Sequence, residues 1–136
     1  MKNDKKLKAE APGNVYSASC PSRLALDMIG NKWSLLIIPL LATRTFRNNE
    51  LMREVEGISQ KMLTQTLREL ERSGLVERID FRTVPPHVEY SLSPLGRSLS
   101  QLLVVVDRWV ESHLPDMRGA QENFDLRQPA EPRRLP

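Results

Sequence analysis

Apolar residues recur at helical spacing in the middle of the chain, between Ser59 and Gly74. The apolar stripe, with the small Thr66 on the same side, consists of Met62, Leu63, Leu67 and Leu70. Such a stripe is typical of an amphipathic helix with one buried face. The Ser59 hydroxyl can accept a hydrogen bond from a first-turn amide, and Ser73-Gly74 can form a left-handed stop. The pattern therefore predicts a helix between these two ends.

Further helices are predicted before this one, over residues 21–29, 32–41 and 48–55. Pro21 suits a first helical turn, Gly30 suits a helix end, and Asn48 suits a cap. Pro39 lies inside the second helix, which is strongly apolar. Because proline lacks the amide hydrogen and crowds the preceding turn, we expect a kink or an early end there.

Alternating apolar and polar positions replace the helical period after Gly74. Residues 75–82 and 87–92 both alternate in this way, which is typical of strands, and two prolines lie in the connection between them. Helix, turn, helix and hairpin in this order make a winged helix-turn-helix. We therefore expect a mainly α fold with a small antiparallel β-hairpin.

A last long helix is predicted from Ser93, as its cap, and Pro94, in its first turn, to near Pro115. Its apolar residues cover more of the helix surface than packing against one small domain would bury, so we expect a homodimer formed through terminal helices. The alternative is that the first helix of the same chain covers this surface. The predicted dimer contacts are Leu99, Leu102, Leu103, Val106, Trp109 and Val110.

The 136 residues suit one domain, with a formal net charge of +3 and 40% hydrophobic residues. We expect a flexible N-terminal arm over residues 1–18, a winged helix-turn-helix domain with its dimerisation helix over 19–117, and a flexible tail over 118–136. Neither a signal-peptide pattern nor an apolar run of membrane-spanning length is visible, so we expect a cytoplasmic protein without a membrane partner.

The outward face of the central helix carries the candidate chemistry. Its amide, hydroxyl, ammonium and guanidinium groups match base-edge and phosphate acceptors of double-stranded DNA, and the major groove admits one helix. A solvated helix face is the alternative interpretation. Residues 44–93 contain eight basic and eight acidic side chains, so attraction to phosphate depends on where the charges lie. The predicted groove contacts are Ser59, Gln60, Lys61, Thr64, Gln65 and Arg68.

Other polar residues are candidates for contacts outside the groove. Arg44, Arg47 and Asn49 precede or begin the third helix and can bind phosphates, although a solvated surface fits them equally well. Arg82 and His87 flank the hairpin tip, where a lone histidine is more often simply exposed.

Enzyme chemistry is not indicated. The sequence lacks a Ser/His/Asp arrangement, a glycine-rich phosphate loop and a metal-ligand cluster, and it contains two histidines. We therefore expect no catalytic residues, no metal and no cofactor. Two alternatives to a DNA-reading role under redox control stay open: control by a non-covalent small-molecule ligand, and a winged helix that serves protein assembly without binding DNA.

With these residues in view, the chain resembles the HxlR-type family of bacterial winged-helix transcriptional regulators. The resemblance runs from Cys20 to about Leu114 and rests on CPSRLALDMIGNKWSLLII, FRNNELMREVEGISQKMLTQTLRELERSGLVER and VPPHVEYSLSPLGRSL. It implies a dimeric regulator, which we expect to be a repressor, on an inverted-repeat operator. Residues 59–72 would form the recognition helix and residues 82–88 the wing tip. Pro39 departs from the family pattern of the second helix.

Cys20, the one cysteine, rules out an intramolecular disulfide. It lies at the start of the first helix, where backbone amides and the helix dipole favour a thiolate, with Arg23 within one turn. The family resemblance implies sensing of oxidants or electrophiles at this position. The alternative interpretation is a small buried apolar side chain.

Overall fold

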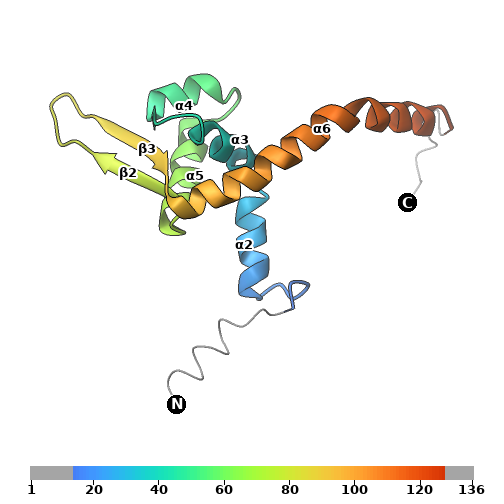
Figure 1. The fold of residues 1–136 in the computed structure, drawn as a ribbon, viewed down its shortest axis with the longest axis horizontal. Helices are drawn as coiled ribbons and strands as arrows, with labels where there is room; N and C mark the ends of the chain where they lie inside the picture. Colours follow the sequence, from blue (N-terminus) through green and yellow to red (C-terminus); the bar gives the residue numbers. More distant parts are fainter. Residues whose placement is uncertain (1–13, 128–136) are drawn as a thin grey trace, which may run out of the picture.

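The computed structural model describes residues 14–127 as a helical body with one small sheet (Figure 1). The predicted N-terminal arm lies outside the described residues as far as position 13, and residues 14–19 form exposed turns. In chain order the elements are α2 (Pro21–Ile29), α3 (Lys32–Leu41), β1 (Phe46–Arg47), α4 (Asn48–Glu54), α5 (Gln60–Arg72), β2 (Val76–Asp80), β3 (Val88–Leu92) and α6 (Pro94–Arg127).

Helices α2 and α3 have the predicted bounds, and local caps explain their ends. The backbone N–H of Gly30 donates to the Leu26 carbonyl at 2.7 Å, which closes α2. The Asn31 side chain then accepts from the backbone N–H of Trp33 at 2.9 Å and starts α3. Pro39 lies inside α3, yet the helix runs on to Leu41, so the early end does not occur. Because Pro39 sits in the last turn, its missing amide costs a single helical bond.

The sheet has three strands in the order β1-β3-β2, all antiparallel, where two strands were predicted. Strand β1 adds Phe46 opposite Tyr90 and Arg47 opposite Glu89. Two residues are too short to show an alternating pattern, so periodicity could not reveal this strand. The predicted hairpin itself is confirmed, with β2 and β3 each shorter than the alternating segments.

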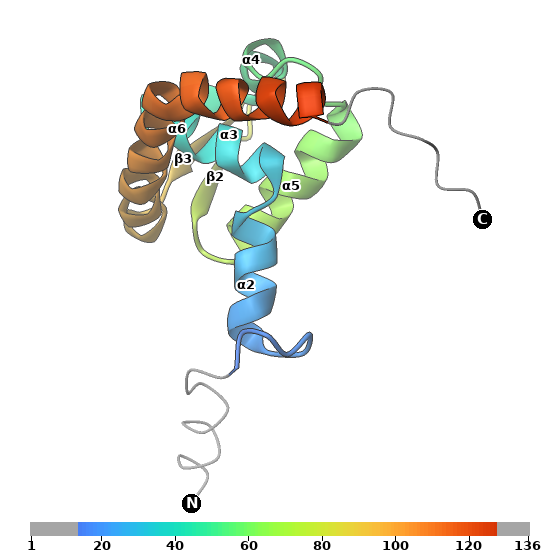
Figure 2. The same cartoon turned by 90° about the vertical axis from the view of Figure 1, so that its right-hand side faces the viewer.

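The core lies around α3, whose Ile37 and Ile38 are fully buried. Helix α3 packs against α2, α5, α6 and β3, and Leu51 of α4 joins the same apolar cluster. Figures 1 and 2 show α2 projecting from one side of this body, and Figure 1 shows the β2-β3 hairpin extending from another. Within the described part of the chain, no single helix has the length and hydropathy to cross a membrane; α2 and α3 reach that level only as a pair bent by 70°.

Helix α6 spans 34 residues and ends at Arg127, so its predicted end near Pro115 is wrong. The segment predicted as a flexible tail is therefore helical from residue 118 to residue 127, and its remainder lies outside the described residues. Proline removes one amide bond and bends a helix without forbidding a new turn after it. Helix-forming residues such as Met117, Ala120 and Gln121 continue the helix beyond Pro115. Figure 2 shows α6 changing direction along its length.

Candidate nucleic-acid interface

Helix α5 begins and ends where the sequence predicts. The Ser59 hydroxyl accepts from the backbone N–H of Met62 at 3.0 Å, and Gly74 follows the helix with a φ of 76°. The inner side of the helix is buried through Leu63, Thr66, Leu67 and Leu70. The Ser59 side chain therefore fixes the helix start, which limits its availability for contacts in a DNA groove.

The outer side of α5 presents a polar stripe, which we define as Lys61, Thr64, Gln65 and Arg68. All four residues are exposed and line one shallow hollow on the surface. The side chains of Lys61, Gln65 and Arg68 make no hydrogen bond or ion pair with the described part of the chain. Their donors are therefore available to an external acceptor.

Gln60 behaves differently from the rest of the predicted contact set. Its side-chain amide exchanges two hydrogen bonds with the amide of Asn48 on α4, at 2.7 and 3.0 Å, and also donates to the Thr64 hydroxyl at 3.0 Å. This role of Asn48 was not predicted from the sequence, which instead indicated Asn48 as the cap of α4. The α4 cap is instead the Arg47 position, whose backbone N–H donates to Glu50 at 2.8 Å.

The loop between β2 and β3, residues 81–87, is called the wing loop. The backbone N–H of Phe81 donates to the His87 carbonyl at 2.9 Å and closes its base. Arg82 has a φ of 53°, a region that arginine seldom adopts, and its backbone N–H donates to the Asp80 carboxylate at 2.8 Å. Arg82 is exposed, and Val84 at the tip is 99% exposed. The loop therefore projects its backbone and one cation into solvent.

The His87 side chain contacts neighbouring elements, whereas the sequence indicated a histidine that is simply exposed beside the hairpin tip. An Nη of Arg47 donates to its Nδ1 at 3.1 Å, and its Nε2 pairs with Glu89 at 2.5 Å. The imidazole also lies against the Phe81 ring, with centroids 4.3 Å apart. His87 thus links β1, β3 and the wing loop, and only about a quarter of its side chain is exposed (26%).

Arg44 and Asn49, which are also predicted phosphate contacts, differ in how far neighbouring residues restrain their side chains. The Arg44 guanidinium lies 3.7 Å from the Phe46 ring centroid and 3.3 Å from the Glu50 carboxylate. The backbone hydrogen bond from Arg47 lowers the pKa of Glu50, and the positive charge of Arg44 lowers it further. Arg44 is therefore already paired with one carboxylate, although about half of its side chain (51%) is exposed. Asn49 is exposed on the first turn of α4.

Known proteins match this arrangement over most of the chain. A family model described as an HxlR-like helix-turn-helix matches residues 28–118. The chain belongs to this family.

One relative and two solved structures illustrate the match. The HTH-type transcriptional regulator YtfH of Escherichia coli is 40% identical over 110 residues, which cover 81% of this chain and 87% of YtfH. The solved structure of the transcriptional regulator ytfH from Salmonella typhimurium has a TM-score of 0.76 at 40% identity, covering 81% of this chain and 98% of that one. The redox regulator HypR in its oxidized form has a TM-score of 0.63 at 42% identity, covering 68% of this chain and 96% of that one. The chain is thus an HTH-type transcriptional regulator with a winged-helix fold.

Cys20 of this HxlR-like chain occupies the N-cap position of α2 but is only 6% exposed. The Arg23 guanidinium, expected to lie near the thiol, donates to the Tyr16 carbonyl at 3.0 Å. The burial fits the packing interpretation, and the helix-start position fits the sensing interpretation. A reagent would have to gain access to the sulfur before it could react.

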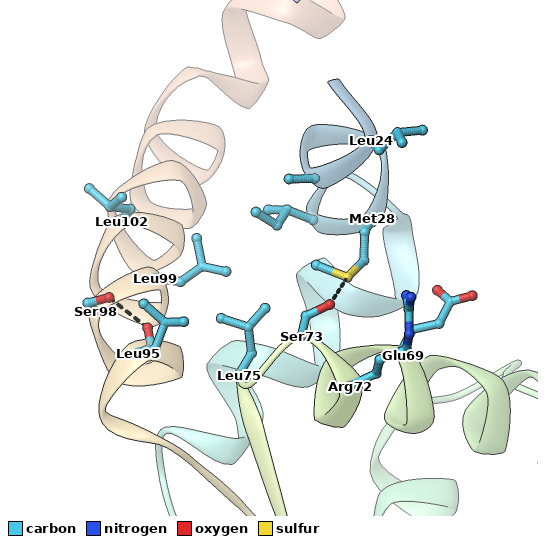
Figure 3. Close-up of a pocket in the computed structure, with 12 residues that line it drawn as sticks. Leu24, Met28, Glu69, Arg72, Ser73, Leu75, Leu95, Ser98, Leu99 and Leu102 are labelled. Carbon is cyan, nitrogen blue, oxygen red and sulfur yellow. Dashed lines mark hydrogen bonds between the residues drawn. The ribbon is translucent and has the colours of Figure 1, made fainter. Parts of the chain in front are cut away.

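Most of the predicted dimer contacts of the HxlR-like chain lie on an apolar surface of α6. Leu102, Val106, Trp109 and Val110 are between 40% and 65% exposed, and Leu99 is half-buried. Leu103 is the exception, because the core of its own protomer buries it to 7% exposure. Beside this surface, α2, the end of α5 and α6 enclose an open groove of about 790 Å³ lined mainly by leucine, methionine and isoleucine (Figure 3).

Among the described residues, no group of three or more histidine, cysteine or carboxylate side chains is arranged to hold a metal ion.

Proposed function

We propose that this regulator binds an inverted-repeat operator as a homodimer, with α5 in the major groove and the wing loop against the phosphate backbone. One observation carries the proposal: the polar stripe of α5 is exposed and its long side chains have no partners in the described part of the chain. Glutamine and arginine are suited to base edges, and a helix of this kind fits the major groove. Arg82 on the wing loop is placed for a phosphate contact.

The homodimer is supported by apolar side chains that the single chain leaves exposed on α2 and α6. Leu24 and Leu26 of α2 are more than half exposed, as is Leu102 across the groove. The later part of α6 also keeps small, apolar or aromatic residues at alternating spacings of four and three, which is the pattern by which two helices pair. These positions are Val106, Val110, His113, Met117, Ala120 and Phe124. A second copy of α6 is the partner that we propose.

The test compares a groove variant with a wing variant on cognate and random DNA. Gln65→Ala removes a base contact, so it should weaken operator binding by about five- to 150-fold while leaving random DNA nearly unaffected. Arg82→Ala removes a phosphate contact, so it should weaken both DNAs alike and reduce the salt dependence of binding. Fluorescence anisotropy titrations at several salt concentrations measure both effects.

Equal losses on both DNAs for both variants would contradict the assigned roles. A parent protein that binds no fragment upstream of its own or adjacent genes better than scrambled DNA would favour the protein-assembly alternative. A promoter-reporter assay then determines the sign of regulation, for which we propose repression.

A thiol response at Cys20 is the second function that we propose, supported by the similarity to HypR, a redox regulator. Diamide would take up two hydrogens and join two Cys20 sulfurs from two protomers, whereas a quinone would alkylate the thiolate. Either treatment should change operator affinity in the parent and leave Cys20→Ser unchanged. Unaltered binding by the treated parent would reject this response and would favour the packing role or control by a non-covalent ligand.

A further inference from the structure

Asn48 and Gln60 come from different helices and pair through their side-chain amides beside the polar stripe. Nδ2 of Asn48 donates to Oε1 of Gln60 at 2.7 Å, and Nε2 of Gln60 donates to Oδ1 of Asn48 at 3.0 Å. Nε2 of Gln60 also donates to the Thr64 hydroxyl at 3.0 Å. Asn48 is half-buried, whereas Gln60 and Thr64 are exposed. The orientation of the Gln60 amide is therefore set by both neighbours before any DNA is present.

Some donor and acceptor groups of the Asn48–Gln60 pair remain unused and are available to a base edge. A glutamine amide has two N–H donors and an oxygen with two acceptor positions. Both donors of Gln60 are used, and one acceptor position of its oxygen remains. Asn48 keeps the second N–H of its own amide and one acceptor position of its oxygen, which accepts only from Gln60. Where Nδ2 of Asn48 meets Oε1 of Gln60, the pair therefore offers a donor from Asn48 beside an acceptor from Gln60.

A single glutamine reads adenine in the major groove by donating to N7 and accepting from the N6 amino group. Gln60 cannot do this alone while its donors are engaged. We propose that Asn48 and Gln60 read an adenine edge together, with Asn48 donating to N7 and Gln60 accepting from N6. Guanine presents two acceptors, N7 and O6, and does not match. This inference rests on the proposed DNA-binding function and makes Asn48 a specificity-determining residue.

The test is base preference at each operator position, measured by selection from randomised DNA and by competition binding. Gln60→Ala removes the acceptor for N6, so it should lower the adenine preference by about tenfold. Asn48→Asp removes the donor to N7, while its carboxylate can still accept from Nε2 of Gln60, so it should lower the same preference to a similar extent. The double variant should lose no more than either single one. Glu54→Ala, at an exposed position of α4 outside the predicted contact set, is the control and should retain the parent's preference.

A variant that fails to fold is recognised by thermal melting, and base preference is compared only among variants that melt with the parent. If Asn48→Asp keeps the adenine preference while Gln60→Ala loses it, Gln60 reads the base alone and the inference is overturned. If Asn48→Asp weakens all sequences equally, Asn48 does not contribute to base selection, which also overturns it. In both cases the parent's selectivity leaves the proposed function intact, whereas a parent that selects no sequence removes both.

Discussion

Gly96 lies in the first turn of α6, where its backbone approaches the chain between α5 and β2. A Cβ atom at this position would lie 2.0 Å from the Leu75 carbonyl oxygen and 3.0 Å from the carbonyl carbon. We expect Gly96→Ala to destabilise the fold by several kcal/mol, because the obstacle is backbone and cannot rotate away. Thermal unfolding followed by circular dichroism measures this change.

Gly119 on the same helix is the matched control, since a Cβ there meets nothing within 4 Å. Gly119→Ala should raise stability by up to about 1 kcal/mol, the difference in helix propensity between the two residues. Similar melting temperatures for the two variants would show that α6 is not seated on Leu75 as closely as described.

Single residues were predictable where their effect is local. The Ser59 cap and the stop at Gly74 follow from side-chain reach and backbone freedom within one turn, and the structure confirms both. The pairing of Gln60 with Asn48 and of His87 with Arg47 was not predictable, because these residues lie 12 and 40 positions apart in the sequence. Only the fold brings Asn48 to α5 and Arg47 to the wing loop.

At the scale of elements, Ser93 joins the start of α6 to the turn between α5 and β2. Its hydroxyl donates to the Gly74 carbonyl at 2.5 Å and accepts from the Gly96 backbone N–H at 2.9 Å, and the residue is buried. Ser93→Ala should cost about 1 to 3 kcal/mol, because it removes the cap of α6 and the hydrogen bond from Ser93 to the Gly74 carbonyl. Chemical denaturation measures the loss.

Ser98→Ala controls for loss of a serine hydroxyl from the same helix. Ser98 donates only to the Leu95 carbonyl, one turn before it, and is exposed. A loss as large as that of Ser93→Ala would mean that the hydrogen bonds of Ser93 stabilise the fold no more than those of any other serine on α6.

The amphipathic elements were predictable from periodicity. Strand β1 was too short to show a pattern, and the end of α6 was predicted near Pro115, although the helix continues through this residue.

At the scale of the whole molecule, the exposed apolar side of α6 predicts association of two copies. Val106 is 51% exposed in the single chain, so Val106→Glu should leave the protomer folded. In a symmetric dimer each copy would bury one added carboxylate, and burying an unpaired charge costs several kcal/mol. We expect the dimer dissociation constant to rise by at least about 100-fold, since each 1.4 kcal/mol corresponds to a factor of ten. Sedimentation equilibrium measures it directly.

Gln101→Glu adds the same side chain at an exposed position roughly opposite Val106 around the helix, at 3.6 residues per turn. This control should dimerise like the parent and bind a full operator normally, whereas Val106→Glu should retain only the weak binding of one half-site. Half-site binding is expected to survive because the polar stripe of α5 lies within a single protomer. A monomeric parent, or equal behaviour of the two variants, would mean that the apolar surface of α6 serves some contact other than a second copy of this chain.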